Sequence, residues 1–143
     1  MKLVVQRVKE ASVTIDNKLY SSVQKGLLVL FGVEKDDSED MLEYYAQKLL
    51  KLRIFEDENG KMNKSVCDTG GEILVVSQFT LCADCKKGTR PSFDNAKEPK
   101  TAKEYYEKFV QILTASGLSV KTGVFAAHMD VSLVNCGPVT IIL

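Results

Sequence analysis

The chain has 143 residues, 45% of them hydrophobic, and its 19 basic residues balance 19 acidic ones. This length allows one domain with a proper core, and the balanced charge excludes a partner that is chosen by overall charge alone. No stretch approaches the roughly 20 apolar residues that are needed to cross a bilayer.

The start of the chain and its cysteines predict the compartment. Met1-Lys2 leads into a short alternating segment and not into the long apolar core of a signal peptide. The 4 cysteines, with one pair spaced Cys82-x-x-Cys85, do not make a disulfide framework at this size. We therefore expect a single domain over residues 1–143 that is cytoplasmic, has reduced thiols and has no membrane partner.

The first part of the chain predicts strands over residues 2–8, 11–15, 19–23 and 27–33. Asp16-Asn17-Lys18 separates the second from the third and predicts a hairpin. The fourth is a continuous apolar run, which is typical of a strand buried on both faces. Arg7 lies on an otherwise apolar face of the first strand, so its donors need carbonyl or carboxylate acceptors.

Two amphipathic helices are expected. Ser38 can cap the first, and its buried positions recur at helical spacing: Leu42, Tyr45, Ala46, Leu49 and Leu50. Thr101 and Glu104 form a capping box for the second, which Gly117 ends. The buried stripe of the second helix is Tyr105, Phe109, Ile112 and Leu113.

The stretch that ends at Leu81 contains the strand around which the fold is organised. Residues 73–76 are apolar without interruption and predict a strand in the middle of the sheet. If this strand continues to Leu81, its alternation places Gln78 and Thr80 on one face, after an aliphatic core. Buried polar groups need partners, a ligand or water. Two interpretations stay open, a hydrogen-bonded strand end and a strand that delivers a site.

The remaining strands are expected over residues 53–55, 120–129 and 139–143. Asn135-Cys136-Gly137-Pro138 precedes the last one, and a proline cannot donate in a central ladder, so we expect a bend there. A Gly-Pro turn is also a position where a cis peptide bond can occur. The pattern as a whole predicts an α/β protein with two helices against a large mixed sheet.

The candidate chemistry lies in three places. The polar loop over residues 82–100 leaves the end of the central strand and carries Lys86, Lys87 and Arg90. Two interpretations of this loop stay open, a functional loop and a solvated run of charges. His128 is the sole histidine, and strand alternation places it away from residues 125, 127 and 129, so we do not expect a catalytic histidine. The cysteines could supply zinc ligands, but only one pair has ligand spacing, which favours free thiols.

Two motifs resemble the bacterial form of the D-aminoacyl-tRNA deacylase family. They are Ser77-Gln78-Phe79-Thr80-Leu81 and Asn135-Cys136-Gly137-Pro138-Val139-Thr140, supported by residues 5–8, 28–34, 90–93 and 123–127. The resemblance spans essentially the whole chain. It implies a compact three-layer β/β/α domain and a homodimer that needs neither cofactor nor metal. It also implies hydrolysis of the ester between a D-amino acid and the terminal adenosine of tRNA, with glycine mischarged on tRNA as a further substrate.

The resemblance also implies roles for single residues. The pocket for the aminoacyl group is lined by Ser77, Gln78, Phe79 and Thr80. Thr80 could be a nucleophile, but without a base to activate it we favour a role in orienting substrate or water.

Gly137 and Pro138, in a cis linkage that Arg7 holds, are implied to enter the partner subunit's pocket and to select chirality. The face that packs on the terminal adenine is implied to be Phe125, Ala127 and Met129. The basic loop would then meet phosphates of the acceptor stem.

Two other functions stay open. The chain could be a nucleic-acid-binding protein without catalysis on the same scaffold, or a hydrolase of small-molecule esters for which tRNA is irrelevant. Deacylation of D-aminoacyl-tRNA by the purified protein separates the first from an enzyme, and free D-amino acid esters test the second.

Overall fold

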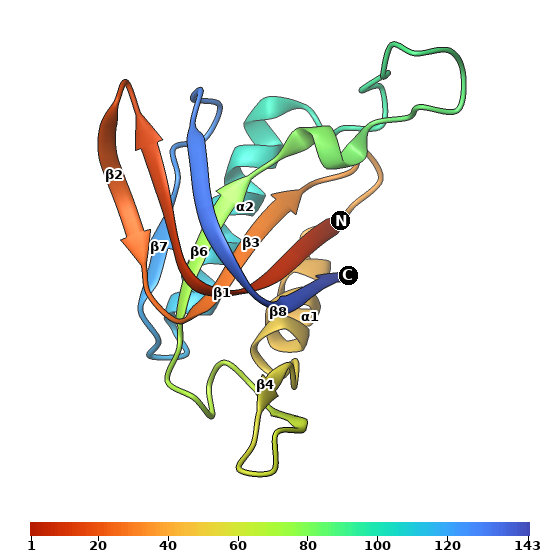
Figure 1. Cartoon of the computed structure of the whole chain (residues 1–143). Helices are drawn as coiled ribbons and strands as arrows, with labels where there is room; N and C mark the ends of the chain where they lie inside the picture. Colours follow the sequence, from red (N-terminus) through yellow and green to blue (C-terminus); the bar gives the residue numbers. More distant parts are fainter.

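The computed structural model describes residues 1–143 and contains one mixed sheet, a small two-stranded sheet and two α-helices (Figure 1). In chain order the elements are β1 (Lys2–Ile15), β2 (Lys18–Val23), β3 (Gly26–Gly32), α1 (Met41–Leu50), β4 (Phe55–Glu56), β5 (Met62–Lys64), β6 (Glu72–Ser77), the 3-10 helix η1 (Phe79–Cys82), α2 (Pro99–Thr114), β7 (Val120–Thr122) and β8 (Asp130–Ile142). None of the helices is long and apolar enough to cross a membrane.

The strand order in the main sheet is β2-β1-β3-β6-β7, with β8 paired to β1. The pairs that β1 makes with β2, β3 and β8 are antiparallel, whereas β3 with β6 and β6 with β7 are parallel. This confirms the α/β class and the mixed sheet.

The two strands expected over residues 2–8 and 11–15 are one long strand, β1. Its first half pairs with β3 as far as Val8, and its second half pairs with β2 from Ala11 onward. β8 pairs with both halves along the other edge, which keeps the strand continuous through the exposed Lys9 and Glu10. The expected hairpin between β1 and β2 is confirmed, and Asp16 and Asn17 both have positive φ angles, as a tight two-residue turn requires.

The sheet curls until its two ends meet, so that it is nearly a closed barrel (Figure 1). Ser21 of β2 donates its hydroxyl hydrogen to the carbonyl oxygen of Thr122 of β7 at 2.8 Å. The interior holds a cluster of buried aliphatic side chains: Val8, Ala11, Val13, Val23, Leu28, Leu74 and Val76. This cluster lies between the two β layers, one formed by β1, β2 and β8 and the other by β3, β6 and β7.

A second core joins the outer face of β3 and β6 to the helices. Val29 and Val75 belong to it, and Phe31 of β3 stacks on Phe109 of α2 with ring centroids 4.5 Å apart. Because alternate residues of β3 and β6 enter the two cores, both strands are buried on both faces, as their continuous apolar runs predict. The β/β/α layering is confirmed.

Both helix starts differ from the expectation. Asp40, and not Ser38, precedes α1, and no side chain caps it. The helix α2 begins at Pro99, two residues before Thr101, because the fixed φ angle of proline suits the first helical position. The Glu98 carboxylate accepts hydrogen bonds from the backbone N–H groups of Thr101 and Lys100, so the expected capping box does not form.

The strand expected over residues 120–129 is wrong beyond Thr122. β7 is short, and the chain then turns through Ala126, which has a φ angle of 62°. The short strand expected at 53–55 is β4, which begins two residues later and pairs with β5 in a separate hairpin. The cysteines are free, and no three His, Cys, Asp or Glu side chains lie close enough to hold a metal ion.

Candidate active site

A cleft of about 660 Å³ opens where β6 ends. Its walls come from three parts of the chain: residues 76–79, residues 93–102 at the start of α2, and residues 125–131 after β7. Most of the 16 lining residues are hydrophobic. A volume of this size falls within the range of roughly 300–1,000 Å³ that is typical of small-molecule sites.

The central strand ends at Ser77 and does not run on to Leu81. Gln78 still donates its N–H to the carbonyl oxygen of Phe31, at 2.8 Å, and then Phe79–Cys82 turn into the 3-10 helix η1. Gly32 of β3 permits this turn, because a Cβ there would lie 3.0 Å from the Gln78 carbonyl oxygen and 3.1 Å from Leu81 Cβ. The expected alternation of Gln78 and Thr80 along one strand face is therefore wrong.

The turn divides the Ser-Gln-Phe-Thr motif. Ser77, Gln78 and Phe79 line the cleft. Thr80 is exposed on η1 and is not among the lining residues. The thiol of Cys82 is buried below η1 and donates to the carbonyl oxygen of Val33 at 3.3 Å, so it anchors the turn from beneath.

The segment from 125 to 129 lines the cleft with all of its residues. Phe125, Ala127 and Met129 are together, as the resemblance groups them, but His128 is in the same wall and does not face away. The reason is the turn at Ala126, which ends the two-residue alternation of a strand. Gly123 lets Met129 fold back, since a Cβ at position 123 would lie 2.6 Å from the Met129 sulfur.

The third wall was not anticipated from the sequence. Lys97 and Glu98 line the cleft, and Phe93 meets Phe79 edge-to-face at its rim, with ring centroids 4.9 Å apart. A hydrogen bond from the Thr101 hydroxyl, followed by the N–H groups that Glu98 caps, lowers the pKa of the Glu98 carboxyl. Glu98 is therefore ionised near neutral pH. The one sequence signal for this wall is Pro99, which marks the first turn of α2.

Hydrogen bonds tie this wall to the segment after β3. Lys97 donates its N–H to the carbonyl oxygen of Val33 at 3.0 Å, and its ammonium group donates to the carbonyl oxygen of Lys35 at 2.7 Å. Lys35 in turn donates its N–H to the carbonyl oxygen of Asn95.

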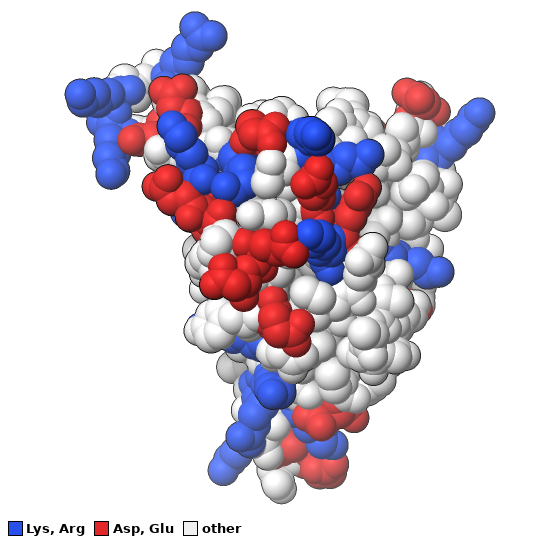
Figure 2. Space-filling model, turned by 180° about the vertical axis from the view of Figure 1, so that it is seen from behind, with Lys and Arg blue, Asp and Glu red and all other residues white.

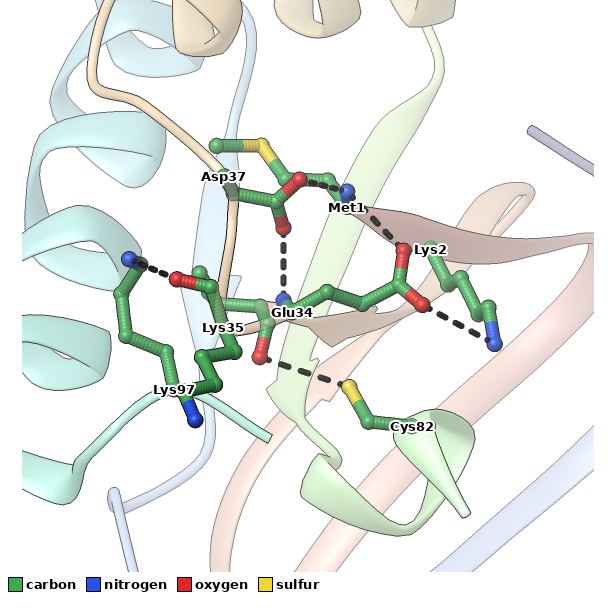
Figure 3. Close-up of polar contacts among 8 residues, drawn as sticks. Met1, Lys2, Glu34, Lys35, Asp37, Cys82 and Lys97 are labelled. Carbon is green, nitrogen blue, oxygen red and sulfur yellow. Dashed lines mark hydrogen bonds and ion pairs between the residues drawn. The ribbon is translucent and has the colours of Figure 1, made fainter. Parts of the chain in front are cut away.

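Figure 3 shows that a cluster of charges holds the same segment from the other side. The Met1 ammonium group pairs with Asp37 and Glu34, and the other oxygen of Asp37 accepts the N–H of Glu34 at 2.6 Å. Glu34 also pairs with Lys2 at 3.2 Å.

The Gly137-Pro138 peptide is cis and lies in a bend of β8, as expected. Asn135 pairs with Val8 and Thr140 pairs with Gln6, so the four residues between them face only Arg7 of β1. Neither Gly137 nor Pro138 is among the residues that line the cleft of its own chain.

Arg7 supports this bend from below, as expected. Its side chain is buried, its Nε donates to the carbonyl oxygen of Cys136 at 2.9 Å, and its Nη1 donates to the carbonyl oxygen of Ile54 at 2.7 Å. Gly137 has a φ angle of 132°, and a Cβ there would lie 2.9 Å from Arg7 Nη2. Position 137 thus requires glycine both for its backbone and for its contact with the guanidinium group.

The basic residues of the long loop are exposed. Asp84 and Ser92 pair through two backbone hydrogen bonds of 2.8 and 3.0 Å, which close the neck of the loop. Lys86, Lys87 and Arg90 lie between them. Figure 2 shows Lys and Arg gathered on this projection, at the upper left of that view.

The chain is similar to known proteins over its full length. Residues 4–143 match the family model described as D-Tyr-tRNA(Tyr) deacylase. The D-aminoacyl-tRNA deacylase of Koribacter versatilis is 58% identical over 143 residues, which are all of this chain and 96% of the relative. The namesake from Aquifex aeolicus is 57% identical over 143 residues, with 100% of this chain and 97% of the relative covered.

Two solved structures share the fold. One, described as "c-Myc DNA Unwinding Element Binding Protein", superposes with a TM-score of 0.94 at 44% identity and covers 100% of this chain and 97% of its own. The other, a "probable eukaryotic D-amino acid tRNA deacylase", has a TM-score of 0.83 at 17% identity, with coverage of 99% and 97%. At that identity the second shows the fold alone.

Proposed function

The chain belongs to the D-Tyr-tRNA(Tyr) deacylase family, and on that premise we propose that it hydrolyses the ester bond of D-aminoacyl-tRNA to release the D-amino acid and tRNA. One observation carries the proposal most directly. The motif that resembles the family's site residues, Ser77-Gln78-Phe79, lines a cleft large enough for an aminoacyl group and part of a nucleoside. The full-length identity to proteins of that name supports the same activity.

The proposed chemistry asks little of any one side chain. An aminoacyl ester on a ribose diol is already activated, so placing water and the neighbouring 2′-hydroxyl supplies much of the rate. Gln78 and the backbone around it hold the aminoacyl end in this scheme, and Thr80 orients substrate or water from η1. The apolar wall of Phe125, Ala127 and Met129 packs on the terminal adenine.

We assign the rejection of L-amino acids to Gly137 and Pro138 of a second copy of the chain. Within one chain the two residues lie outside the cleft, so they can act on an aminoacyl group only from another subunit. Glycine has no side chain to exclude, so glycine mischarged on tRNA is a substrate in the same scheme.

A homodimer is therefore part of the proposal. Support comes from β8, which pairs only with β1 and leaves its other edge open. Large apolar side chains are exposed on this strand, with Val134 at 44% and Ile142 at 75%. Such an edge is suited to a second copy of the same chain.

The basic loop completes the assignment. Lys86, Lys87 and Arg90 contact acceptor-stem phosphates in this scheme, while the cleft receives the single-stranded 3′ end through stacking and 2′-hydroxyl contacts.

The decisive experiment compares matched D-Tyr-tRNA and L-Tyr-tRNA, with the free ethyl ester of D-tyrosine as a third substrate. We expect rapid release of D-tyrosine from tRNA and far slower reaction of the other two. Equal rates on D- and L-Tyr-tRNA would contradict the chiral assignment, and a preference for the free ester would make tRNA irrelevant.

The second candidate function is nucleic-acid binding without catalysis. It is favoured by the similarity to the solved structure whose description names a DNA element. Binding of a labelled DNA duplex together with no deacylation of D-Tyr-tRNA would select this candidate.

A further inference from the structure

The hairpin of β4 and β5 and the bend that carries Gly137-Pro138 both contact Arg7. Two groups on the hairpin side surround Arg7: the carbonyl oxygen of Ile54, just before β4, accepts a hydrogen bond from it, and the carboxylate of Glu56 forms an ion pair with it. Glu56 Oε1 is 3.5 Å from Arg7 Nη2, and no other carboxylate forms an ion pair with this guanidinium group.

The guanidinium group connects the hairpin with the bend. Arg7 Nε donates to the Cys136 carbonyl oxygen, and Arg7 Nη2 lies so close to Gly137 that a Cβ at position 137 would be 2.9 Å from it. The same Nη2 faces Glu56. Because guanidinium is planar and rigid, a rotation that follows Glu56 also moves the donors that face Cys136 and Gly137.

The hairpin presents Glu56 from a well-fixed backbone. Phe55 is buried in the main core and pairs with Lys64. The carboxylate of Asp57 accepts the N–H groups of Asn59 and Lys61, at 2.9 and 3.1 Å, and so closes the turn that follows. Glu56 itself is 59% exposed beside a small cleft of about 300 Å³, whereas the Arg7 side chain is only 8% exposed.

We infer that Glu56 is a positioning residue for chiral selection: its carboxylate holds the orientation of Arg7 and thereby the place of Gly137-Pro138. This inference rests on the proposed function, in which that dipeptide rejects L-amino acids in the partner's cleft. Glu56 touches no substrate in this role and acts only through Arg7.

The test uses three variants at position 56 and a control on the same hairpin. Glu56→Gln removes the charge at nearly constant size, Glu56→Lys reverses it, and Glu56→Asp retains it. Glu58→Lys is the control, because Glu58 pairs with Lys64 and is not a partner of Arg7. For each full-length protein, single-turnover rates on D-Tyr-tRNA and L-Tyr-tRNA are measured together with the melting temperature.

We expect Glu56→Gln to lower the ratio of D to L rates by about 1.4- to fivefold, the range that corresponds to the loss of a partly exposed ion pair. Glu56→Lys lowers the ratio further, Glu56→Asp restores much of it, and Glu58→Lys leaves it unchanged. A purely structural role would lower the melting temperature without changing this ratio.

Each result bears on one claim. An unchanged ratio in both Glu56→Gln and Glu56→Lys would overturn the inference, as would an equal fall of the ratio in Glu58→Lys. If Glu56→Lys fails to fold, Glu56→Gln decides alone. A wild-type protein that does not deacylate D-Tyr-tRNA contradicts the proposed function instead, so the two failures are distinct.

Discussion

Replacing Gly137 with alanine tests how tightly Arg7 and the bend of β8 are packed. The new Cβ would lie 2.8 Å from Val139 Cγ2 and 2.9 Å from Arg7 Nη2, at a φ angle of 132°. A backbone position of this kind costs a non-glycine residue on the order of 1–3 kcal/mol. Moving the buried guanidinium group away weakens a charge-assisted hydrogen bond worth about 1.5–3 kcal/mol. Together the loss of unfolding free energy is about 2.5–6 kcal/mol.

A matched variant separates the backbone cost from the contact. Gly117 has a φ angle of 84°, but a Cβ there would meet no atom within 4 Å. Gly117→Ala should therefore cost only about 1–2 kcal/mol. The assay is urea unfolding of both variants at pH 7 and at one protein concentration, because association changes apparent stability. If Gly137→Ala costs no more than Gly117→Ala, the packing of Arg7 against the bend does not contribute as described.

Three further predictions concern the site and its wall. Thr80→Ala should keep most of the single-turnover activity on D-Tyr-tRNA, because in the proposed scheme Thr80 orients substrate or water from the exposed helix η1 and forms no bond with the substrate. A loss of about a hundredfold or more would favour a nucleophile or proton-transfer role. Alanine at Lys86, Lys87 and Arg90 together should reduce the slope of log affinity for tRNA against log salt by close to one unit for each phosphate that the loop no longer neutralises, and an unchanged slope would remove the loop from the interface. Glu98→Gln should lower the melting temperature at pH 7. The Thr101 hydroxyl and the N–H groups of Thr101 and Lys100 lower the pKa of the Glu98 carboxyl in the folded protein. The stabilisation is therefore present above the ordinary carboxyl pKa of 4.5 and is lost as the pH falls through the lower pKa of the folded state. A difference between the two proteins that persists undiminished at pH 2 would contradict this origin.

The layers of the fold could be predicted because the residues that build them carry strong local signals. The apolar runs of β3 and β6 have no polar interruption, and both strands are buried on both faces. Asp16-Asn17 is a turn signal that matches its geometry. The polar position of Arg7 on an apolar face correctly indicated that carbonyl oxygens would accept from it, and a carboxylate, Glu56, forms an ion pair with it.

The details of the site depend on contacts between distant parts of the chain. In the sequence, Phe79 and Leu81 continue the alternating pattern of β6, although the chain turns into η1 after Gln78. The turn depends on the close approach of Gln78 and Leu81 to Gly32, which a side chain at position 32 would prevent. The place of His128 depends on a positive φ angle at Ala126, for which alanine gives no warning. Lys97 lies in the cleft wall because its N–H and its ammonium group donate to the carbonyl oxygens of Val33 and Lys35, which follow β3 some sixty residues earlier in the chain.

The central claim of the proposal is that the dipeptide of one subunit acts in the cleft of the other, and subunit complementation tests it most directly. A variant with its cleft filled, Ala127→Trp, is co-assembled with Gly137→Ala, so that each mixed dimer has one intact cleft facing one intact Gly137-Pro138. We predict that neither variant alone hydrolyses D-Tyr-tRNA with discrimination against L-Tyr-tRNA. The mixed dimers should regain both the hydrolysis of D-Tyr-tRNA and the discrimination against L-Tyr-tRNA. Discrimination that never returns in mixed dimers shown to form would contradict the account.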